Sequence, residues 1–357
     1  MRIVQLIDSL QMGGAEKMAV QYANALAGHV AFSGLVATRR EGPLKAIIDR
    51  GVTYVFLNKK GKFDWRALWQ LRTYCKKHRI GYIHAHGTSF FTATLAKCLM
   101  PRLKIIWHDH HGNRSNQSVA QNRMLWLCAR FFDRVIAVNH ELLAWSKGSL
   151  GVRRAIYLPN FIVASPAIGT TILSGTPGKR ILCLANLRHP KNHLLLLEVA
   201  RHLRTTHPDW TLHLVGEDRA DGYSDALKAF ITQHQLHESV YLYGLRTDTA
   251  HIIAQAEIAV IASTYEGLPV ALLEYGIYEK AVVCTAVGQI PSIVQDGVNG
   301  LLVRPDWEPF YQALHRLIVN RDMRVALGSA LKDTISGQYS EKAVIQQYLQ
   351  WIECDDK

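Results

Sequence analysis

The chain has 357 residues, of which 48% are hydrophobic and 20% are charged. This composition is typical of a globular protein and excludes a disordered chain, and the length favours two domains over one. No run of about 18 uncharged apolar residues is present, and Met1–Leu6 has no signal-peptide core, so we expect a protein without a membrane span. The six cysteines form no CxxC motif and no close pair, which is typical of reduced cytoplasmic thiols.

The net charge of +12 is distributed unevenly along the chain. Residues 1–160 contain 24 Lys and Arg against 8 Asp and Glu, whereas residues 161–357 contain 17 against 21. The first part therefore carries +16 and the second −4. Such asymmetry indicates two domains with different roles. Nucleic acid, an anionic membrane surface or an acidic substrate could each account for the basic part.

Short β-branched runs alternate with amphipathic, helix-length segments, and this pattern occurs twice. It predicts two doubly wound parallel sheets whose strand ends meet at a shared cleft. We expect an N-terminal domain at 1–163, a second domain at 178–337, and a helix at 338–357 that packs back toward the first. The expected strands are Ile3–Ile7, Gly34–Ala37, Val52–Leu57, Tyr82–Ala85, Lys104–Trp107, Val135–Val138, Ile156–Leu158, Ile181–Ala185, Thr211–Val215, Val240–Tyr243, Ile258–Ala262, Ala281–Thr285 and Leu301–Val303.

Glycines follow the first expected strand, in the run Asp8–Glu16. Gly13 and Gly14 let the backbone approach a ligand, and the N–H groups of the following helix suit an anion. The GxGxxG pattern of nicotinamide-binding folds is absent. A plain strand-to-helix turn is the alternative.

A helix is predicted from Asp64. Leu68, Leu71 and Cys75 lie on the side that can face the core. A second stripe of the same helix combines tryptophans with cations, which suits an anionic bilayer, although a solvated helix face is the alternative. The membrane-facing candidates are Trp65, Trp69, Arg72 and Lys76. A second basic and aromatic stretch runs from Arg114 to Arg134.

Histidines gather near two expected strand ends, at His84 and His86 and at His108, His110 and His111. Histidine can serve as an acid, a base, a hydrogen-bonding group or a metal ligand. The HAHGT run lacks the Asp-His of an HxHxDH hydrolase site, and no carboxylate has ligand spacing. Structural or substrate-contacting histidines are therefore favoured over metal ligands.

Two motifs in the second half suit a nucleotide sugar. Arg188 and Lys191 flank a strand end and a helix start, which suits a diphosphate. Glu266 follows the strand Ile258–Ala262, Pro269 is expected as the first helical residue, and Glu274 lies further along that helix. Backbone N–H groups at 268–270 would meet phosphate, while carboxylates accept hydrogen bonds from sugar hydroxyls.

The ordered motifs closely resemble the retaining glycosyltransferases of family GT4, which have the GT-B fold. The matching runs are Leu182–Leu187 with Lys191 and Asn192, Leu214–Glu217, Tyr243–Gly244, Ser263–Pro269 with Glu274, Gly288, and Asp296–Val303. Gly13–Glu16 and Leu158–Asn160 match more weakly in the first half.

The resemblance implies a role for individual residues. Glu266 is similar to the glutamate that contacts the donor sugar, Glu274 to the one that binds ribose, and Lys191 to the lysine that holds the diphosphate. Gly14 is similar to the glycine whose backbone approaches the donor phosphate. The further donor-binding candidates are Arg188, Leu268, Pro269 and Val270. His110 is similar to the active-site histidine, with His111 and His86 as alternates or acceptor contacts.

The chain departs from the family pattern at two positions. Asn186 stands where the family usually has arginine, and Arg188 is the candidate to replace that charge. Ser292 stands where a glutamate is common.

The resemblance further implies a metal-independent enzyme without a cofactor. We expect a UDP-sugar in preference to a GDP-sugar as donor, and a lipid-linked glycan as acceptor, in the synthesis of capsule, O-antigen or exopolysaccharide. We expect peripheral attachment to the inner face of the cytoplasmic membrane and no binding of nucleic acid. The alternatives are another GT-B enzyme, such as a nucleotide-sugar epimerase or a phosphorylase, and, more remotely, a nucleic-acid-binding protein.

Overall fold

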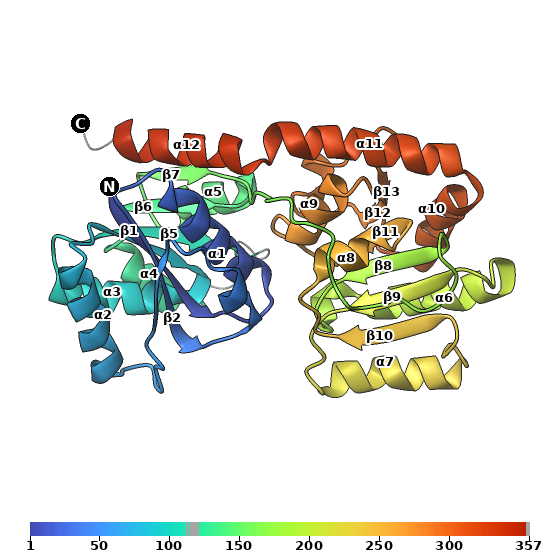
Figure 1. Ribbon diagram of the computed structural model, residues 1–357, viewed down its shortest axis with the longest axis horizontal. Coiled ribbons are helices and arrows are strands. Elements are labelled where there is room, and N and C mark those ends of the chain that lie inside the picture. Colours follow the sequence, from blue (N-terminus) through green and yellow to red (C-terminus); the bar gives the residue numbers. More distant parts are fainter. Residues whose placement is uncertain (112–113, 115–120, 355–357) are drawn as a thin grey trace. The chain divides into compact units, whose positions relative to one another are not determined.

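The computed structural model describes residues 1–111, 114 and 121–354. The chain divides into two compact units, which are coloured along the sequence in Figure 1. Unit 1 comprises Met1–Asn160 together with Glu341–Lys357, and unit 2 comprises Phe161–Ser340. The segment at 161–178, which the sequence marks as a linker, belongs to unit 2, where Thr170 N and Thr171 N both donate to the Asp248 carboxylate at 2.8 Å.

Unit 1 contains a seven-stranded parallel sheet in the order β3-β2-β1-β4-β5-β6-β7. Helices cover both faces of this sheet, as a parallel sheet requires. The strands are β1 Arg2–Ser9, β2 Phe32–Arg40, β3 Thr53–Phe56, β4 Tyr82–His86, β5 Lys104–Asp109, β6 Arg134–Ala137 and β7 Ala155–Tyr157. The helices are α1 Gly14–Ala27, α2 Trp65–Lys77, α3 Phe90–Leu99, α4 Arg123–Ala129, α5 His140–Gly148 and α12 Glu341–Cys354, with short 3-10 turns η1 Pro43–Ile47 and η2 Gly87–Ser89.

Unit 2 contains a six-stranded parallel sheet in the order β10-β9-β8-β11-β12-β13. The strands are β8 Arg180–Leu184, β9 Thr211–Val215, β10 Val240–Gly244, β11 Ile258–Ile261, β12 Ala281–Thr285 and β13 Leu301–Val303. The helices are α6 His193–Thr206, α7 Gly222–Gln233, α8 Thr249–Ala254, α9 Val270–Ile277, α10 Trp307–Val319 and α11 Arg321–Gln338, with 3-10 turns η3 His189–Lys191 and η4 Ile290–Ser292.

The two faces of the unit 1 sheet differ in chemistry. On one face, Ile83, Ile105 and Trp107 pack with α2, α3 and α4 in a continuous hydrophobic core. On the other face, His84 and the following alternate residues of β4 and β5 lie against aromatic rings of α1 and α12. Because side chains alternate along a strand, the same two strands supply both an apolar core and a buried polar layer.

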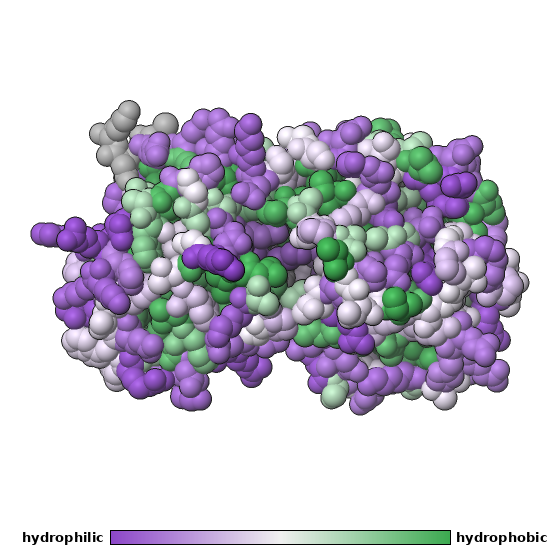
Figure 2. All heavy atoms as spheres, in the orientation of Figure 1, coloured by the Kyte–Doolittle hydropathy of each residue, from purple (hydrophilic) through white to green (hydrophobic). Residues whose placement is uncertain are grey.

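The expected doubly wound α/β fold is confirmed, and all thirteen expected strands are present. The strand predicted at 104–107 continues to Asp109, which places His108 within it. No described helix is both long and apolar enough to cross a membrane. On the face drawn in Figure 2, hydrophobic side chains form small groups among hydrophilic ones.

The C-terminal helix α12 belongs to unit 1 by its contacts. The Tyr348 ring is fully buried, lies 5.3 Å from the Tyr22 ring of α1, and its hydroxyl is 3.2 Å from His84 Nδ1. Farther along the helix, the buried Arg134 guanidinium of β6 donates to the Ile352 carbonyl at 3.0 Å. The helix therefore closes the polar face of the unit 1 sheet.

Replacing Tyr348 by alanine is expected to lower the free energy of unfolding by about 3 kcal/mol or more, because the substitution leaves a cavity under α12. Urea denaturation followed by circular dichroism measures this change. The neighbouring Gln347 is exposed, so Gln347→Ala is the matched control and should change stability by less than about 0.5 kcal/mol. Equal effects of the two substitutions would contradict this packing.

Candidate active site

A buried ion pair lies where β8 and β11 end. Lys191, in the turn after β8, pairs its ammonium with Glu266 Oε1 from the loop after β11. Ser263 Oγ donates to the same oxygen at 2.6 Å, and Thr264 N donates to the Pro190 carbonyl at 2.9 Å, which joins the two loops. The Lys191 and Glu266 side chains are only 17% and 10% exposed. Charged groups this sheltered interact strongly with each other and with any ligand that enters.

The backbone of Glu266 is held from the side by Gly288. Gly288 has φ +56°, and a Cβ atom added there would lie 1.8 Å from the Glu266 carbonyl oxygen. The next residue, Gln289, donates its N–H to the Gly267 carbonyl at 3.0 Å. Only glycine fits both the conformation and the close approach, so this loop fixes the position of Glu266.

Helix α9 begins one residue later than the sequence predicts. Pro269 has φ −70° and ψ 120° and precedes the helix, so the expectation that it is the first helical residue is wrong. An extended residue directly before a helix still leaves N–H groups of the first turn free of intrahelical partners. The Leu268 and Val270 side chains are buried, which leaves their backbone as the part that suits a ligand.

Glu274 lies one turn into α9. It is only 8% exposed, and its Oε1 accepts a hydrogen bond from Thr249 Oγ1 at 3.1 Å. Together with Glu266, it places two largely buried carboxylates at the two ends of the segment from the β11 loop into α9.

The positions where the chain departs from the family pattern have structural explanations. Asn186 Oδ1 accepts from Glu217 N at 2.9 Å, so this side chain ties the loop after β8 to the loop after β9. Arg188 is exposed and lies in the same turn as Lys191, whose N–H donates to the Arg188 carbonyl at 2.9 Å. Ser292 is exposed and its hydroxyl donates to the Gln289 carbonyl at 2.8 Å.

In unit 1, Gly14 is the first residue of α1, directly after the turn that follows β1. Gly13 precedes the helix in extended conformation, and a Cβ atom there would lie 2.2 Å from a Glu16 carboxylate oxygen. The Ser9 hydroxyl donates to Glu16 Oε1 at 3.3 Å. The glycine pair therefore allows α1 to start tightly packed at the carboxyl edge of the sheet.

Four histidines of unit 1 form two hydrogen-bonded rows. In the first row, His84 Nε2 lies 3.2 Å from His108 Nδ1. In the second, His86 Nδ1 lies 3.0 Å from His110 Nε2, and His86 Nε2 lies 2.8 Å from Gln5 Oε1. The rows are stacked: the His84 and His86 ring centroids are 4.3 Å apart, and those of His108 and His110 are 4.0 Å apart.

Burial keeps this histidine array uncharged. It lowers the pKa of His110 to about 3 and holds those of His84, His86 and His108 well below their usual value. Since the Gln5 oxygen accepts, His86 carries its proton on Nε2 and accepts at Nδ1 from His110 Nε2–H. His110 Nδ1 is then a bare lone pair, and it has no hydrogen-bond partner among the described residues. His110 is therefore an acceptor of hydrogen bonds, not an acid.

Three of these rings also have atoms placed for a metal ion, since one nitrogen each of His84, His86 and His108 lies within 4.8 Å of the others. The hydrogen bond from His84 to His108 requires a proton between the two nitrogens, which a metal would have to displace. The absence of a metal stays a prediction from the sequence.

His110 and His111 differ in how they are held. His110 contacts His86, whereas the His111 backbone N–H donates to Asp109 Oδ1 at 3.0 Å. The other Asp109 oxygen pairs with Arg114 Nε at 2.8 Å. Sequence reasoning missed Gln5 and Asp109. Gln5 is a lone polar residue within the apolar β1 strand, and Asp109 lies between His108 and His110, so each offered a signal in the sequence.

Comparisons with known proteins cover both units. Residues 12–165 match the family model described as Glycosyltransferase Family 4, and residues 178–320 match that described as Glycosyl transferases group 1. Together they span most of the chain. The chain belongs to glycosyltransferase family 4.

Individual relatives are distant. The chain is 29% identical over 138 residues to the lipopolysaccharide core biosynthesis glycosyltransferase LpsE of Rhizobium meliloti, covering 38% of this chain and 39% of that protein. It is 22% identical to the Escherichia coli UDP-Gal:alpha-D-GlcNAc-diphosphoundecaprenol alpha-1,3-galactosyltransferase, covering 94% and 92%. The chain thus spans about two fifths of the first relative and nearly all of the second.

Among solved structures, HepE of Anabaena in complex with UDP and glucose superimposes with a TM-score of 0.82 at 18% identity, covering 99% of both chains. The fold of this family 4 enzyme is therefore GT-B, with two Rossmann-like domains. The expected shared cleft and the role of each site residue stay predictions.

The neutral histidine array predicts how stability depends on pH. The His110 pKa is lowered on folding, so the unfolded chain binds protons first as pH falls below about 6.5, and folding stability is lost from that pH downward. The free energy of unfolding, measured by urea titration, should therefore decrease as the pH is lowered from 7.5 to 5. In His110→Gln the slope should be smaller by about one proton. Identical slopes in the two proteins would contradict a buried neutral His110.

Proposed function

We propose that the chain is a retaining glycosyltransferase that moves a sugar from a nucleotide-sugar donor, UDP-linked in preference to GDP-linked, to a lipid-linked glycan in cell-surface polysaccharide synthesis. The observation that carries the proposal is the buried Lys191–Glu266 pair at the ends of β8 and β11. A cation beside a carboxylate at the carboxyl edge of a parallel sheet suits a ligand with both phosphate and hydroxyl groups.

In this proposal each half of the ion pair binds a different part of the donor. The Lys191 ammonium contacts the diphosphate, with Arg188 and the backbone at Leu268, Pro269 and Val270 as additional donors. Glu266 accepts hydrogen bonds from the sugar hydroxyls. Because the Lys191 and Glu266 charges neutralise one another, neither is buried unpaired before a donor binds.

The remaining donor contacts come from α9 and α1. The buried Glu274 carboxylate accepts from the ribose hydroxyls, which two acceptor oxygens suit. Gly14 presents the start of α1, without a side chain, to the donor phosphate. No metal is needed for the leaving group, because cations and N–H groups stabilise its charge.

His110 takes part as a neutral acceptor of hydrogen bonds. Its Nδ1 lone pair accepts from a sugar or acceptor hydroxyl, while His86 holds the ring from behind. His111, whose backbone is tied to Asp109, is an additional contact for the acceptor. In the transfer step the bond from the anomeric carbon to the phosphate oxygen breaks, the acceptor oxygen bonds to that carbon on the same face, and the acceptor proton passes to the departing phosphate.

Three substitutions test the donor site. Lys191→Ala and Glu266→Ala are expected to lower kcat/KM at least a hundredfold, since each removes a transition-state contact and strands a buried charge. Glu274→Ala should mainly raise KM for the donor. Transfer from labelled nucleotide sugar measures all three. Lys179→Ala, which breaks the exposed pair with Asp209, is the matched control and should retain activity. If all three site variants keep wild-type turnover, this site assignment is wrong.

Metal independence is tested separately. After dialysis against EDTA, the enzyme is expected to retain full activity and to contain less than about 0.1 metal ion per chain by elemental analysis, because the catalytic charges in this proposal are side chains and backbone. Loss of activity that added zinc or magnesium restores would contradict it, and stoichiometric metal would place an ion among the histidines.

The acceptor is proposed from the relatives and from the surface of unit 1. The E. coli relative is named for an acceptor on diphosphoundecaprenol, a lipid. On α2, the Trp65 and Trp69 side chains are 64% and 52% exposed, Arg72 stacks 4.7 Å from the Trp69 ring, and Lys76 is exposed. Such a helix suits the interface of an anionic bilayer, so we place the enzyme on the inner face of the cytoplasmic membrane.

The second basic and aromatic stretch, from Arg114 to Arg134, offers fewer exposed cations to a membrane than the sequence suggests. Arg114 is buried against Asp109, and Arg134 is fully buried beneath α12. Trp126, Leu127 and Phe131 remain 40–44% exposed around α4. The outward-facing aromatic residues of α2 and α4 are therefore the part of this basic half that fits a bilayer.

Membrane attachment is tested with vesicles. Wild-type protein is expected to co-sediment with vesicles rich in anionic lipid, and the double variant Trp65→Ser, Trp69→Ser should bind at least tenfold more weakly, because exposed tryptophans supply the buried area. Val325, 63% exposed on α11 of unit 2, provides the control Val325→Ser. Equal binding to neutral and anionic vesicles would remove the electrostatic part of the proposal.

A further inference from the structure

Unit 1 buries a lysine whose ammonium contacts a hydroxyl and a ring, and no carboxylate among the described residues. The Lys59 residue is only 6% exposed, and its ammonium donates to the Thr92 hydroxyl at 2.8 Å and lies 5.8 Å from the Phe91 ring centroid. Within the described part of the chain it forms no ion pair. Burying an ammonium against a hydroxyl and a ring is costly unless an anion completes the site.

The backbone holds Lys59 in this place. Asn58 adopts a left-handed conformation with φ +50°, and the Lys59 N–H donates to the Thr38 carbonyl of β2 at 2.7 Å. The turn after β3 therefore brings the lysine back over the carboxyl edge of the sheet. This edge is where ligands bind in open parallel sheets.

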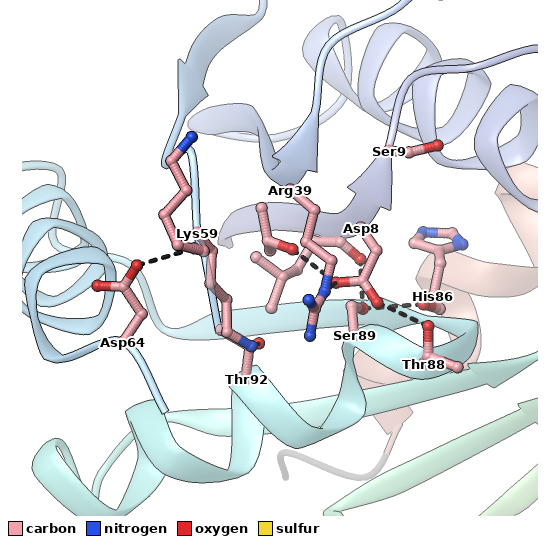
Figure 3. Close-up of polar contacts among 12 residues, drawn as sticks. Asp8, Ser9, Arg39, Lys59, Asp64, His86, Thr88, Ser89 and Thr92 are labelled. Carbon is pink, nitrogen blue, oxygen red and sulfur yellow. Dashed lines mark hydrogen bonds and ion pairs between the residues drawn. The ribbon is translucent and has the colours of Figure 1, made fainter. Parts of the chain in front are cut away.

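The Asp8 carboxylate near Lys59 already has other partners. Asp8 accepts from the Thr38 hydroxyl at 2.5 Å and from the Thr88 hydroxyl at 2.6 Å, and it lies 3.7 Å from Arg39 Nε. Figure 3 shows the Arg39 side chain between Lys59 and Asp8. The Asp8 charge is thus shared with Arg39 and two hydroxyls, and the Lys59 ammonium is left facing a second cation.

The local electrostatics favour an anion. Burial lowers the pKa of Lys59, and the positive charge of Arg39 lowers it further, whereas the smaller effects of the Asp8 and Asp64 charges raise it. Thr92, its hydrogen-bond partner, lies in the first turn of α3, where the helix dipole also disfavours a cation. A negatively charged group between Lys59 and Arg39 would relieve all three effects.

We propose that Lys59 and Arg39 form an anion subsite that binds a phosphate group of the acceptor. This inference rests on the function proposed above, in which the acceptor is a glycan on a lipid diphosphate. The subsite lies at the ends of β2 and β3 in unit 1, whereas the Lys191 site proposed for the donor diphosphate belongs to unit 2. It would select acceptors that carry phosphate over neutral glycans.

The test compares two acceptors that share a glycan, one on a lipid diphosphate and one on an uncharged alkyl chain. Lys59→Met keeps the length of the side chain and removes its charge. We expect it to raise KM for the diphosphate acceptor about ten- to a hundredfold, the usual effect of losing a charged hydrogen bond, and to leave KM for the neutral acceptor unchanged. Arg39→Gln, at an exposed position, should shift the same KM in the same direction.

Lys60→Met is the matched control, since Lys60 is the exposed neighbour and should leave both KM values unchanged. Equal changes of Lys59→Met on both acceptors, or no change on either, would overturn the subsite. If Lys59→Met does not fold, the result of Arg39→Gln decides in the same way.

A binding measurement separates failure of the subsite from failure of the proposed function. In a Lys191→Ala background, which disables the donor site, calorimetry with inorganic pyrophosphate should show binding that Lys59→Met weakens at least tenfold. Absence of transfer to any acceptor by the wild type contradicts the proposed function alone. Pyrophosphate binding that Lys59→Met leaves unchanged overturns the subsite, whatever the enzyme transfers.

Discussion

Every strand of both sheets runs parallel to its neighbours, and this constraint decides where chemistry can occur. In a parallel sheet all carboxyl ends lie at one edge, so the loops that follow β1, β2, β3, β4 and β5 gather in unit 1, and those that follow β8 and β11 gather in unit 2. Because helices cover both faces, this edge is where side chains from several strands can meet a ligand. Residues far apart in the sequence, such as Lys191 and Glu266, meet because their strands are neighbours.

The second recurring feature is that charge is sheltered and only partly compensated. Lys191 and Glu266 neutralise one another, the four histidines are neutral because burial disfavours their charged form, and Lys59 forms no direct ion pair with any residue that the structure describes. In the proposals above, these three arrangements serve three different tasks. A paired site can open for a ligand of mixed charge, a neutral imidazole accepts a hydroxyl, and an unpaired ammonium is completed by an anion.

Much of the fold was predictable from the sequence, because alternating β-branched runs and amphipathic helices are local patterns. The placement of Glu266, Pro269 and Glu274 near one another was predictable for the same reason, since they lie in one continuous segment, while their role in donor binding stays a prediction. The start of α9 was misplaced by one residue, since proline is tolerated on either side of a helix boundary.

The polar network of unit 1 could not be predicted. Gln5, His86 and Tyr348 come from β1, β4 and α12, and no local pattern relates a glutamine in an apolar strand to a tyrosine more than 300 residues away. In the sequence Lys59 is one of three neighbouring lysines with Lys60 and Lys62, and only the turn at Asn58 places it in the interior. Such long-range polar contacts depend on packing, which periodicity does not encode.

The central claim is that the site around Lys191, Glu266 and Glu274 binds a nucleotide sugar, and a thermal-shift panel of UDP- and GDP-sugars tests it most directly. A ligand that binds only the folded protein raises its melting temperature, by more as its concentration exceeds the Kd. We predict an increase with at least one UDP-sugar that Glu274→Ala diminishes. No shift with any nucleotide sugar, or an equal shift in wild type and Glu274→Ala, would contradict the account.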